Sequence, residues 1–195
     1  QQKFELDASG HHIGPEKLSV SMLPITNLQV FGREAELNSL EKAWKEAKTN
    51  VMQVIAFGGV GKSTLINSWL SSLDRNKYLG AKRVYAWSFY WQGSGAEVKS
   101  SGDYFIEHAL EWFGDERPTE GTPWSKAARL ANLIRSARTL LILDGLEPLQ
   151  YPPGHNQGLV ENPAVALLIR ELASDNNGLC LITARLPVSD LISFQ

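Results

Sequence analysis

A run from Val54 to Leu65, VIAFGGVGKSTL, holds residue types that can bind a chain of phosphates. Its glycines let the backbone curl so that successive N–H groups point at an anion, and a helix that starts just after them adds the positive end of its dipole. Lys62 is expected to reach the β- and γ-phosphates, Ser63 to bind Mg²⁺, and Thr64 to bond the α-phosphate. The run is therefore interpreted as a P-loop. Its predicted nucleotide-binding residues are Gly58, Gly59, Val60, Gly61, Lys62, Ser63 and Thr64.

One position of this run departs from the pattern GxxxxGK[ST]. The first glycine would fall at position 56, where the chain has alanine. Alanine fits if the residue has a negative φ, whereas a positive φ would strain the loop. The alternative interpretation of the run is a glycine-rich turn that binds nothing. The order of apolar strand, loop, Lys-Ser and helix favours the P-loop.

Three charged residues follow later apolar runs and are expected at the same edge of a sheet. Asp144 ends the run TLLIL and is the candidate ligand of hydrated Mg²⁺, with a turn cap as the alternative. Glu147 is a candidate to orient or deprotonate the attacking water, or else a solvated loop carboxylate. Arg185, after the run LCLIT, could contact the γ-phosphate and sense ATP against ADP; the alternative is a surface arginine.

The elements that must position these residues alternate between apolar strands and amphipathic helices. Strands that are apolar throughout and separated by helices are typical of a parallel sheet covered on both faces. The sequence thus predicts an α/β fold. The predicted strands are 51–57, 83–91, 139–143 and 179–183, and the predicted helices are 34–48, 63–73, 102–113, 125–138 and 163–174, with another helix starting within 188–194.

Composition limits the class of protein. The 195 residues, 43% hydrophobic and 21% charged, suffice for one ordinary core. A net charge of −2 argues against a strongly basic nucleic-acid surface, so a nucleic-acid partner is not indicated. The single cysteine, Cys180, lies in an apolar run and is expected to be buried in a reducing compartment, which favours the cytoplasm.

Neither a membrane span nor an export signal is visible in the sequence. No stretch approaches 18 apolar residues and the polar N-terminus has no hydrophobic signal region, so no membrane association is expected. Residues 1–22 lack periodicity and are interpreted as a linker or N-terminal extension. Residues 23–195 are expected to form the nucleotide-binding domain.

Four segments in order, VFGREAEL, AFGGVGKSTL, LLILDGLEPLQ and LITARLP, resemble the nucleotide-binding domain of STAND signalling NTPases. This group includes the NB-ARC and NACHT domains of bacterial and eukaryotic immune receptors. The resemblance covers about residues 23–191. It implies an ASCE-type P-loop NTPase with strand order 5-1-4-3-2, in which the fifth strand, the helical lid and the winged-helix domain are missing from this chain.

The resemblance also implies roles for matching positions. Lys62 is the Walker A lysine, Asp144 the Walker B acid, Glu147 the downstream acid of the NACHT-type pattern and Arg185 the sensor arginine. Gly145 stands where many related ATPases carry a glutamate, which argues against fast hydrolysis. The segment expected to pack against adenine contains Phe31, Gly32 and Arg33.

The function implied by the resemblance is a switch. ADP would hold a closed monomer, and ATP with Mg²⁺ would favour an open homo-oligomer that activates an upstream effector in bacterial antiphage defence. A downstream sensor and slow ATP hydrolysis complete this expectation. Two other hypotheses stay open: a turnover enzyme such as a kinase or motor ATPase, and an inert scaffold. Adenine is favoured over guanine mainly by the resemblance.

Overall fold

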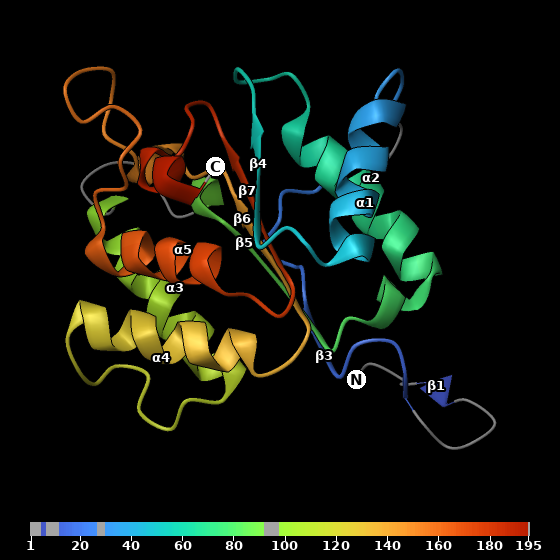
Figure 1. The fold of residues 1–195 in the computed structure, drawn as a ribbon, viewed down its shortest axis with the longest axis horizontal. Helices are drawn as coiled ribbons and strands as arrows, with labels where there is room; N and C mark the ends of the chain where they lie inside the picture. The colour runs from blue at the N-terminus through green and yellow to red at the C-terminus, as the bar shows by residue number, and fades with distance from the viewer. Residues whose placement is uncertain (1–4, 7–11, 27–29, 92–97, 195) are drawn as a thin grey trace.

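The computed structural model describes residues 5–6, 12–26, 30–91 and 98–194. A parallel sheet lies between two layers of helices (Figure 1). The α/β prediction is confirmed. One face of the sheet is covered by α1 (Glu34–Glu46) and α2 (Lys62–Arg75), and the other by α3 (Val98–Phe113), α4 (Pro123–Arg135) and α5 (Pro163–Ser174).

The sheet has the order β3-β5-β6-β7-β4, and all neighbouring strands are parallel. The part β4-β7-β6-β5 is the predicted order 1-4-3-2. The described residues place no strand on the outer edge of β4, where the resemblance implies a further one. The strands are β3 (Lys17–Ser19), β4 (Val51–Ile55), β5 (Arg83–Ser88), β6 (Thr139–Asp144) and β7 (Leu179–Ala184).

The strand β3 was not expected, because its three residues lie within the segment 1–22 that shows no periodicity. It pairs with β5 at the edge of the sheet opposite β4. Nearer the N-terminus, β1 (Glu5–Leu6) and β2 (His12–Ile13) form a separate antiparallel pair. Part of the predicted extension therefore joins the parallel sheet as the edge strand β3, at the opposite edge from the strand that the resemblance implies.

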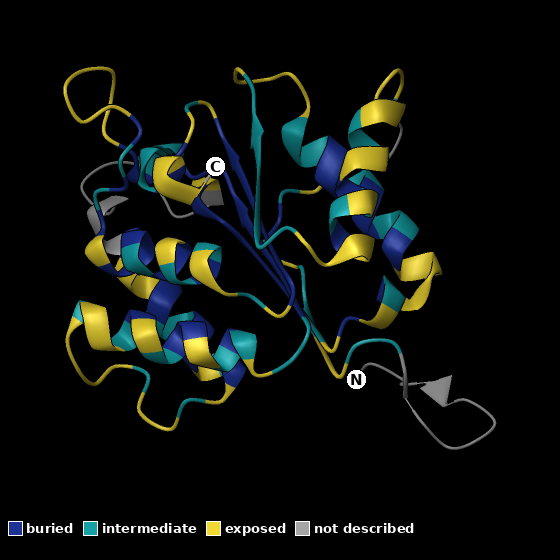
Figure 2. Ribbon diagram, viewed as in Figure 1, coloured by how far each residue is buried: buried dark blue, intermediate teal, exposed yellow. Residues whose placement is uncertain are grey.

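The core is divided by the sheet into two hydrophobic clusters. Along β5, Tyr85 and Trp87 face the α3–α5 layer, whereas Val84 and Ala86 face the α1–α2 layer, as the period of two in a strand requires. The three central strands are buried almost throughout, and the edge strand β4 is only half-buried (Figure 2). Cys180 is fully buried as predicted, and burial raises the pKa of its thiol to about 12.

Several predicted boundaries differ from the structure. The strand predicted to reach Trp91 ends at Ser88, because its neighbour β6 stops at the paired Asp144. The chain continues as the 3₁₀ turn η2 (Phe89–Trp91). The helix predicted from Gly102 begins at Val98. The remaining short turns are η1 (Lys77–Gly80), η3 (Glu147–Leu149) and η4 (Ser189–Phe194), the last in place of the predicted helix in 188–194.

Gly102 explains why the sequence pattern placed the start of α3 too late. It lies inside α3, where a Cβ atom would come within 2.7 Å of the Asn162 side chain. A glycine in a helix pattern normally marks an end, but here it allows close packing against the start of α5.

The start of α5 follows the predicted capping signal, and its contribution can be measured. The Asn162 Oδ1 accepts hydrogen bonds from the N–H groups of Ala164 and Val165, with Pro163 in the first turn. Replacing Asn162 with alanine is expected to lower the free energy of unfolding by about 1 kcal/mol. Urea unfolding should show this loss, and the exposed Asn156→Ala should not. Equal stability of both variants would contradict the cap.

Candidate nucleotide-binding site

The loop between β4 and α2 crosses the carboxyl edge of the sheet (Figure 1). Gly59 and Gly61 have φ values of 78° and 89°, which glycine adopts without steric cost. Ala56 is not among the described non-glycine residues with positive φ, and its N–H donates to the Ala184 carbonyl at 3.2 Å. Alanine at the first glycine position therefore continues the strand ladder and does not strain the loop.

The backbone of this loop offers donors to an anion. The first hydrogen bond of α2 runs from the Leu65 N–H to the Gly61 carbonyl at 2.9 Å, so the N–H groups of residues 62–64 have no carbonyl one turn earlier. Within the described residues, no N–H group from Gly58 to Thr64 donates a hydrogen bond. A helix N-terminus after a glycine-rich turn is the usual setting for a bound phosphate.

The Lys62 side chain lies folded over the loop. Its Nζ donates hydrogen bonds to the carbonyl oxygens of Ala56 at 2.8 Å and Phe57 at 3.2 Å. It also forms an ion pair with Glu147 at 3.6 Å, and its side chain is only 9% exposed. The ammonium group is thus held at the mouth of the loop by partners that an anion could replace.

Asp144 lies at the end of β6, next to the start of α2. The Ser63 Oγ is 3.1 Å from both carboxylate oxygens of Asp144. Thr183 donates to its Oδ1 at 2.7 Å, and the Ser88 Oγ lies 3.4 Å from its Oδ2. Burial raises the pKa of Asp144 above its ordinary value, although these three hydroxyl groups act in the opposite direction.

The donor set fits Mg²⁺. A serine hydroxyl and a carboxylate held side by side are the hard oxygen ligands that this ion prefers, usually together with phosphate oxygens and water. Among the described residues, no group of three or more His, Cys, Asp or Glu side chains could hold a metal ion. An ion here would therefore rely on Ser63, Asp144 and ligands from the nucleotide.

Glu147 and Arg185 meet beside the P-loop. The Arg185 Nε lies 3.8 Å from the Glu147 Oε1, and its guanidinium packs over Gly58, where a Cβ atom would be 3.1 Å from the Arg185 Cζ. The predicted site residues of the P-loop, β6 and β7 are therefore brought together at one edge of the sheet.

Gly145 and Tyr90 form a second close contact at this edge. Gly145 has a φ of 69°, and a Cβ atom there would lie 2.2 Å from ring atoms of Tyr90. Burial, with a smaller contribution from the nearby Glu147 charge, raises the pKa of Tyr90 to about 12. The tyrosine ring therefore covers the position that directly follows Asp144.

The segment predicted to pack against adenine lies beside the loop but is open to solvent. Phe31 is 85% exposed and Gly32 has a φ of 66°. Arg33 forms an ion pair with Glu36 at 2.7 Å and donates to the Val60 carbonyl at 3.4 Å. The structure thus places this segment next to the P-loop, and a contact with adenine remains a prediction.

Three residues of the site escaped the sequence analysis. Thr183 and Ser88 flank Asp144 from the two neighbouring strands, and Tyr90 follows β5. Hydroxyl residues at the ends of the strands next to β6, the strand that ends at Asp144, were a usable signal. Their relevance depends on the strand register, which pairs Ser88 with Asp144.

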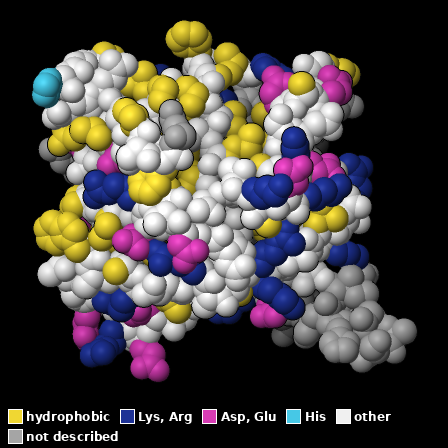
Figure 3. Space-filling view, viewed as in Figure 1, with side chains coloured by type: hydrophobic (Ala, Val, Ile, Leu, Met, Phe, Trp, Pro, Cys, Tyr) yellow, Lys and Arg dark blue, Asp and Glu magenta, His cyan; other side chains and the backbone are white. Residues whose placement is uncertain are grey.

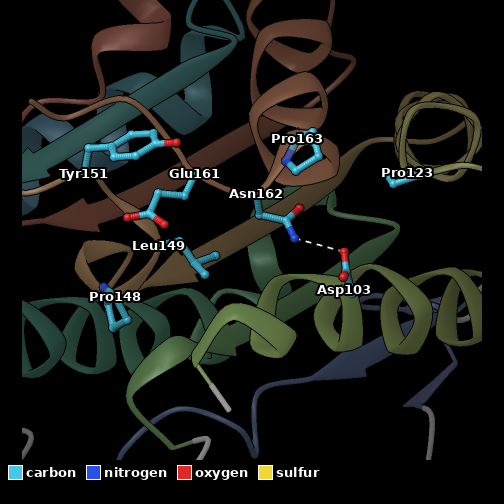
Figure 4. Close-up of a pocket in the computed structure, with 8 residues that line it drawn as sticks. All are labelled: Asp103, Pro123, Pro148, Leu149, Tyr151, Glu161, Asn162 and Pro163. Carbon is cyan, nitrogen blue, oxygen red and sulfur yellow. Dashed lines mark hydrogen bonds between the residues drawn. The ribbon is translucent and has the colours of Figure 1, made fainter. Parts of the chain in front are cut away.

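A cavity of about 300 Å³ lies next to η3. Its lining includes Pro148, the residue after Glu147. Figure 4 shows the Asn162 side chain directed at Asp103 within this lining, and its Nδ2 donates a hydrogen bond of 2.9 Å to the Asp103 Oδ1. It contains none of the predicted nucleotide-binding residues. The lining consists of Asp103, Pro123, Pro148, Leu149, Tyr151, Glu161, Asn162 and Pro163.

The surface carries charges of both signs. On the face shown in Figure 3, acidic and basic side chains are interspersed over the helices and do not gather into one basic patch. Within the described ranges, no helix has the length and apolar character needed to cross a bilayer.

Comparison with known proteins supports the fold. No family model and no curated protein matches the chain. Among solved structures, it is similar to the Orc1 protein of Aeropyrum pernix in complex with DNA, with a TM-score of 0.58 and 20% identity over 86% of this chain and 43% of that one. It is also similar to Drosophila ORC bound to DNA, with a TM-score of 0.54 and 16% identity over 83% of this chain and 40% of that one.

At these identities the likeness shows the fold alone, and the chain spans less than half of either neighbour. The chain has the α/β P-loop NTPase fold, with a parallel five-stranded sheet and helices on both faces.

Proposed function

We propose that this chain is the nucleotide-binding switch domain of a STAND-type NTPase that binds ATP or ADP with Mg²⁺. The observation that carries the proposal is the convergence of Lys62, Ser63, Asp144, Glu147 and Arg185 beside the free N–H groups of the P-loop. The resemblance supplies the finer assignment to the NB-ARC and NACHT relatives.

Different residues of the site bind different parts of the nucleotide and its Mg²⁺. Lys62 and the loop N–H groups bind the phosphate oxygens, while Ser63 and Asp144 hold Mg²⁺, which neutralises phosphate charge when bound. Thr183 and Ser88 orient the Asp144 carboxylate through their hydroxyl groups. Arg185 contacts the end of the phosphate chain, so it distinguishes the two nucleotides.

Hydrolysis at this site is proposed to be slow. Glu147 is the candidate for orienting or deprotonating the attacking water, but it follows the Walker B acid by three residues. Directly after Asp144, Gly145 has a positive φ and the Tyr90 ring covers it, so no carboxylate stands at that position. Slow turnover suits a switch, because the ATP-bound state then persists long enough to be read by partners.

The wider setting is also a proposal. ATP would favour a homo-oligomer that activates an upstream effector, with winged-helix and sensor domains downstream, in antiphage defence in the cytoplasm. A steady-state ATPase assay beside mass measurement with ADP and with a non-hydrolysable ATP analogue tests this. Slow turnover and a higher mass with the analogue are expected. Many turnovers per second with no change of mass would favour a turnover ATPase or kinase instead.

Arg185 offers a specific test of the sensor role. Replacing it with alanine is expected to reduce the preference for ATP over ADP by about tenfold, since the guanidinium contacts only the longer phosphate chain. Calorimetric titration with ADP and the ATP analogue measures both affinities. The matched control is Arg170→Ala, because Arg170 lies on α5 and forms an ion pair with Asp190. Equal loss for both nucleotides would contradict a γ-phosphate contact.

A further inference from the structure

The Glu147 carboxylate is buried without a good partner. Both of its oxygen atoms are inaccessible to solvent, and neither accepts a hydrogen bond within the described part of the chain. Burying a charged group in this way is costly unless it is paired. The Tyr90 side chain also lies close to this carboxylate, which contributes to the raised pKa of the tyrosine. Two cations approach the same oxygen, Oε1: the Lys62 ammonium at 3.6 Å and the Arg185 guanidinium at 3.8 Å.

The loop that carries Glu147 is fixed to β7. The Gly145 N–H donates to the Thr183 Oγ1 at 2.8 Å, and the Leu146 N–H donates to the Thr183 carbonyl at 2.9 Å. The Tyr90 ring lies against Gly145 from the other side. The backbone at 145–146 is therefore held from two directions, and Glu147 is directed between Lys62 and Arg185.

Lys62 is assigned to the β- and γ-phosphates, and Arg185 to the γ-phosphate at the end of the chain. A carboxylate between them occupies the place that suits a terminal phosphate: an anionic oxygen flanked by an ammonium and a guanidinium. We propose that Glu147 is a built-in competitor of the γ-phosphate, which ATP must displace from Lys62 and Arg185 and which ADP leaves in place. The inference rests on the proposed function, because it concerns the same nucleotide site.

Competition of this kind sets the nucleotide preference. Two anions that share one pair of cations exclude each other, so each weakens the binding of the other by the same factor. The shorter ADP does not extend to the contested position. Glu147 thus biases the domain towards ADP, and the energy spent on moving its side chain couples the arrival of ATP to the loop after β6.

The test is calorimetric titration of Glu147→Gln and the unchanged protein with ADP and with a non-hydrolysable ATP analogue, each in Mg²⁺. The neutral amide should tighten analogue binding by about tenfold and change ADP binding less than twofold, because only the analogue competes with the carboxylate. Glu147→Ala should act in the same direction. The control is Glu107→Gln, which removes a carboxylate of α3 that forms an ion pair with Lys126 of α4. It should leave both affinities unchanged.

The outcomes separate this inference from the proposed function. If the unchanged protein binds both nucleotides and Glu147→Gln leaves their ratio the same or lowers it, the competitor role is wrong while the nucleotide site stands. If the unchanged protein binds neither nucleotide, the proposed function itself fails. Because the analogue is not hydrolysed, a role of Glu147 in activating water would leave the ratio unaltered. A melting curve for each variant confirms that the protein is folded.

Discussion

Replacing Lys62 with alanine is expected to weaken ATP and ADP binding together by about 100-fold, the equivalent of about 2.7 kcal/mol. The Lys62 side chain is 9% exposed and its ammonium group already donates to the carbonyls of Ala56 and Phe57, so its preferred position lies inside the loop. Both nucleotides carry a β-phosphate, so both should lose this charge-assisted contact. Calorimetric titration with each nucleotide measures the loss.

The matched control is Lys42→Ala on α1, because the Lys42 side chain is 72% exposed and forms an ion pair with Glu46 at 3.9 Å. That variant should bind as the unchanged protein does. An inert scaffold predicts that Lys62→Ala changes neither affinity nor activity, so a large loss would reject the scaffold hypothesis. Unchanged affinity for both nucleotides would instead remove Lys62 from the site.

Replacing Asp144 with asparagine is expected to weaken the effect of Mg²⁺ on ATP binding while it raises the stability of the fold. The variant should lose the strengthening of ATP binding by Mg²⁺, about tenfold or more, because an amide is a poor ligand for this ion. At the same time it should be more stable by about 1 kcal/mol, or about 3 °C in melting temperature. The amide has the same shape as the carboxylate and can accept from Thr183 and donate to Ser63.

The sign of the stability effect follows from the pKa. Burial raises the pKa of Asp144 in the folded chain, so folding favours the protonated form and the ionised carboxylate destabilises the fold. This cost is present above the raised pKa and disappears as the pH falls through it. Differential scanning calorimetry at neutral pH, with and without Mg²⁺, measures the effect. A lower melting temperature than that of the unchanged protein would contradict this sign. Asp74→Asn, an exposed position near the end of α2, is the control.

The sequence predicted the parts of the site that depend on local order. The P-loop, Asp144 after β6 and Arg185 after β7 follow from apolar runs with charged residues at their ends, and parallel strands bring such ends to one edge. The N-terminal signal of α5, Asn162 followed by Pro163, was equally local. Four strands were therefore predictable from the sequence pattern, whereas their order was implied by the resemblance.

The contacts between distant segments were not predictable in this way. The Tyr90 ring covers Gly145, and Thr183 bonds Asp144, because of the register of three strands that only the folded chain fixes. The strand β3 has too few residues for a periodic pattern. The position of Glu147 between two cations likewise depends on how η3 is fixed to β7.

The central claim is that the P-loop amides, Lys62 and Asp144 bind a nucleotide and its magnesium ion. Its most direct test is a calorimetric titration of the protein with ADP and with a non-hydrolysable ATP analogue in the presence of Mg²⁺. We predict saturable binding of one molecule of either nucleotide per chain. Absence of binding for both nucleotides, in a sample shown to be folded by its melting curve, would contradict the account.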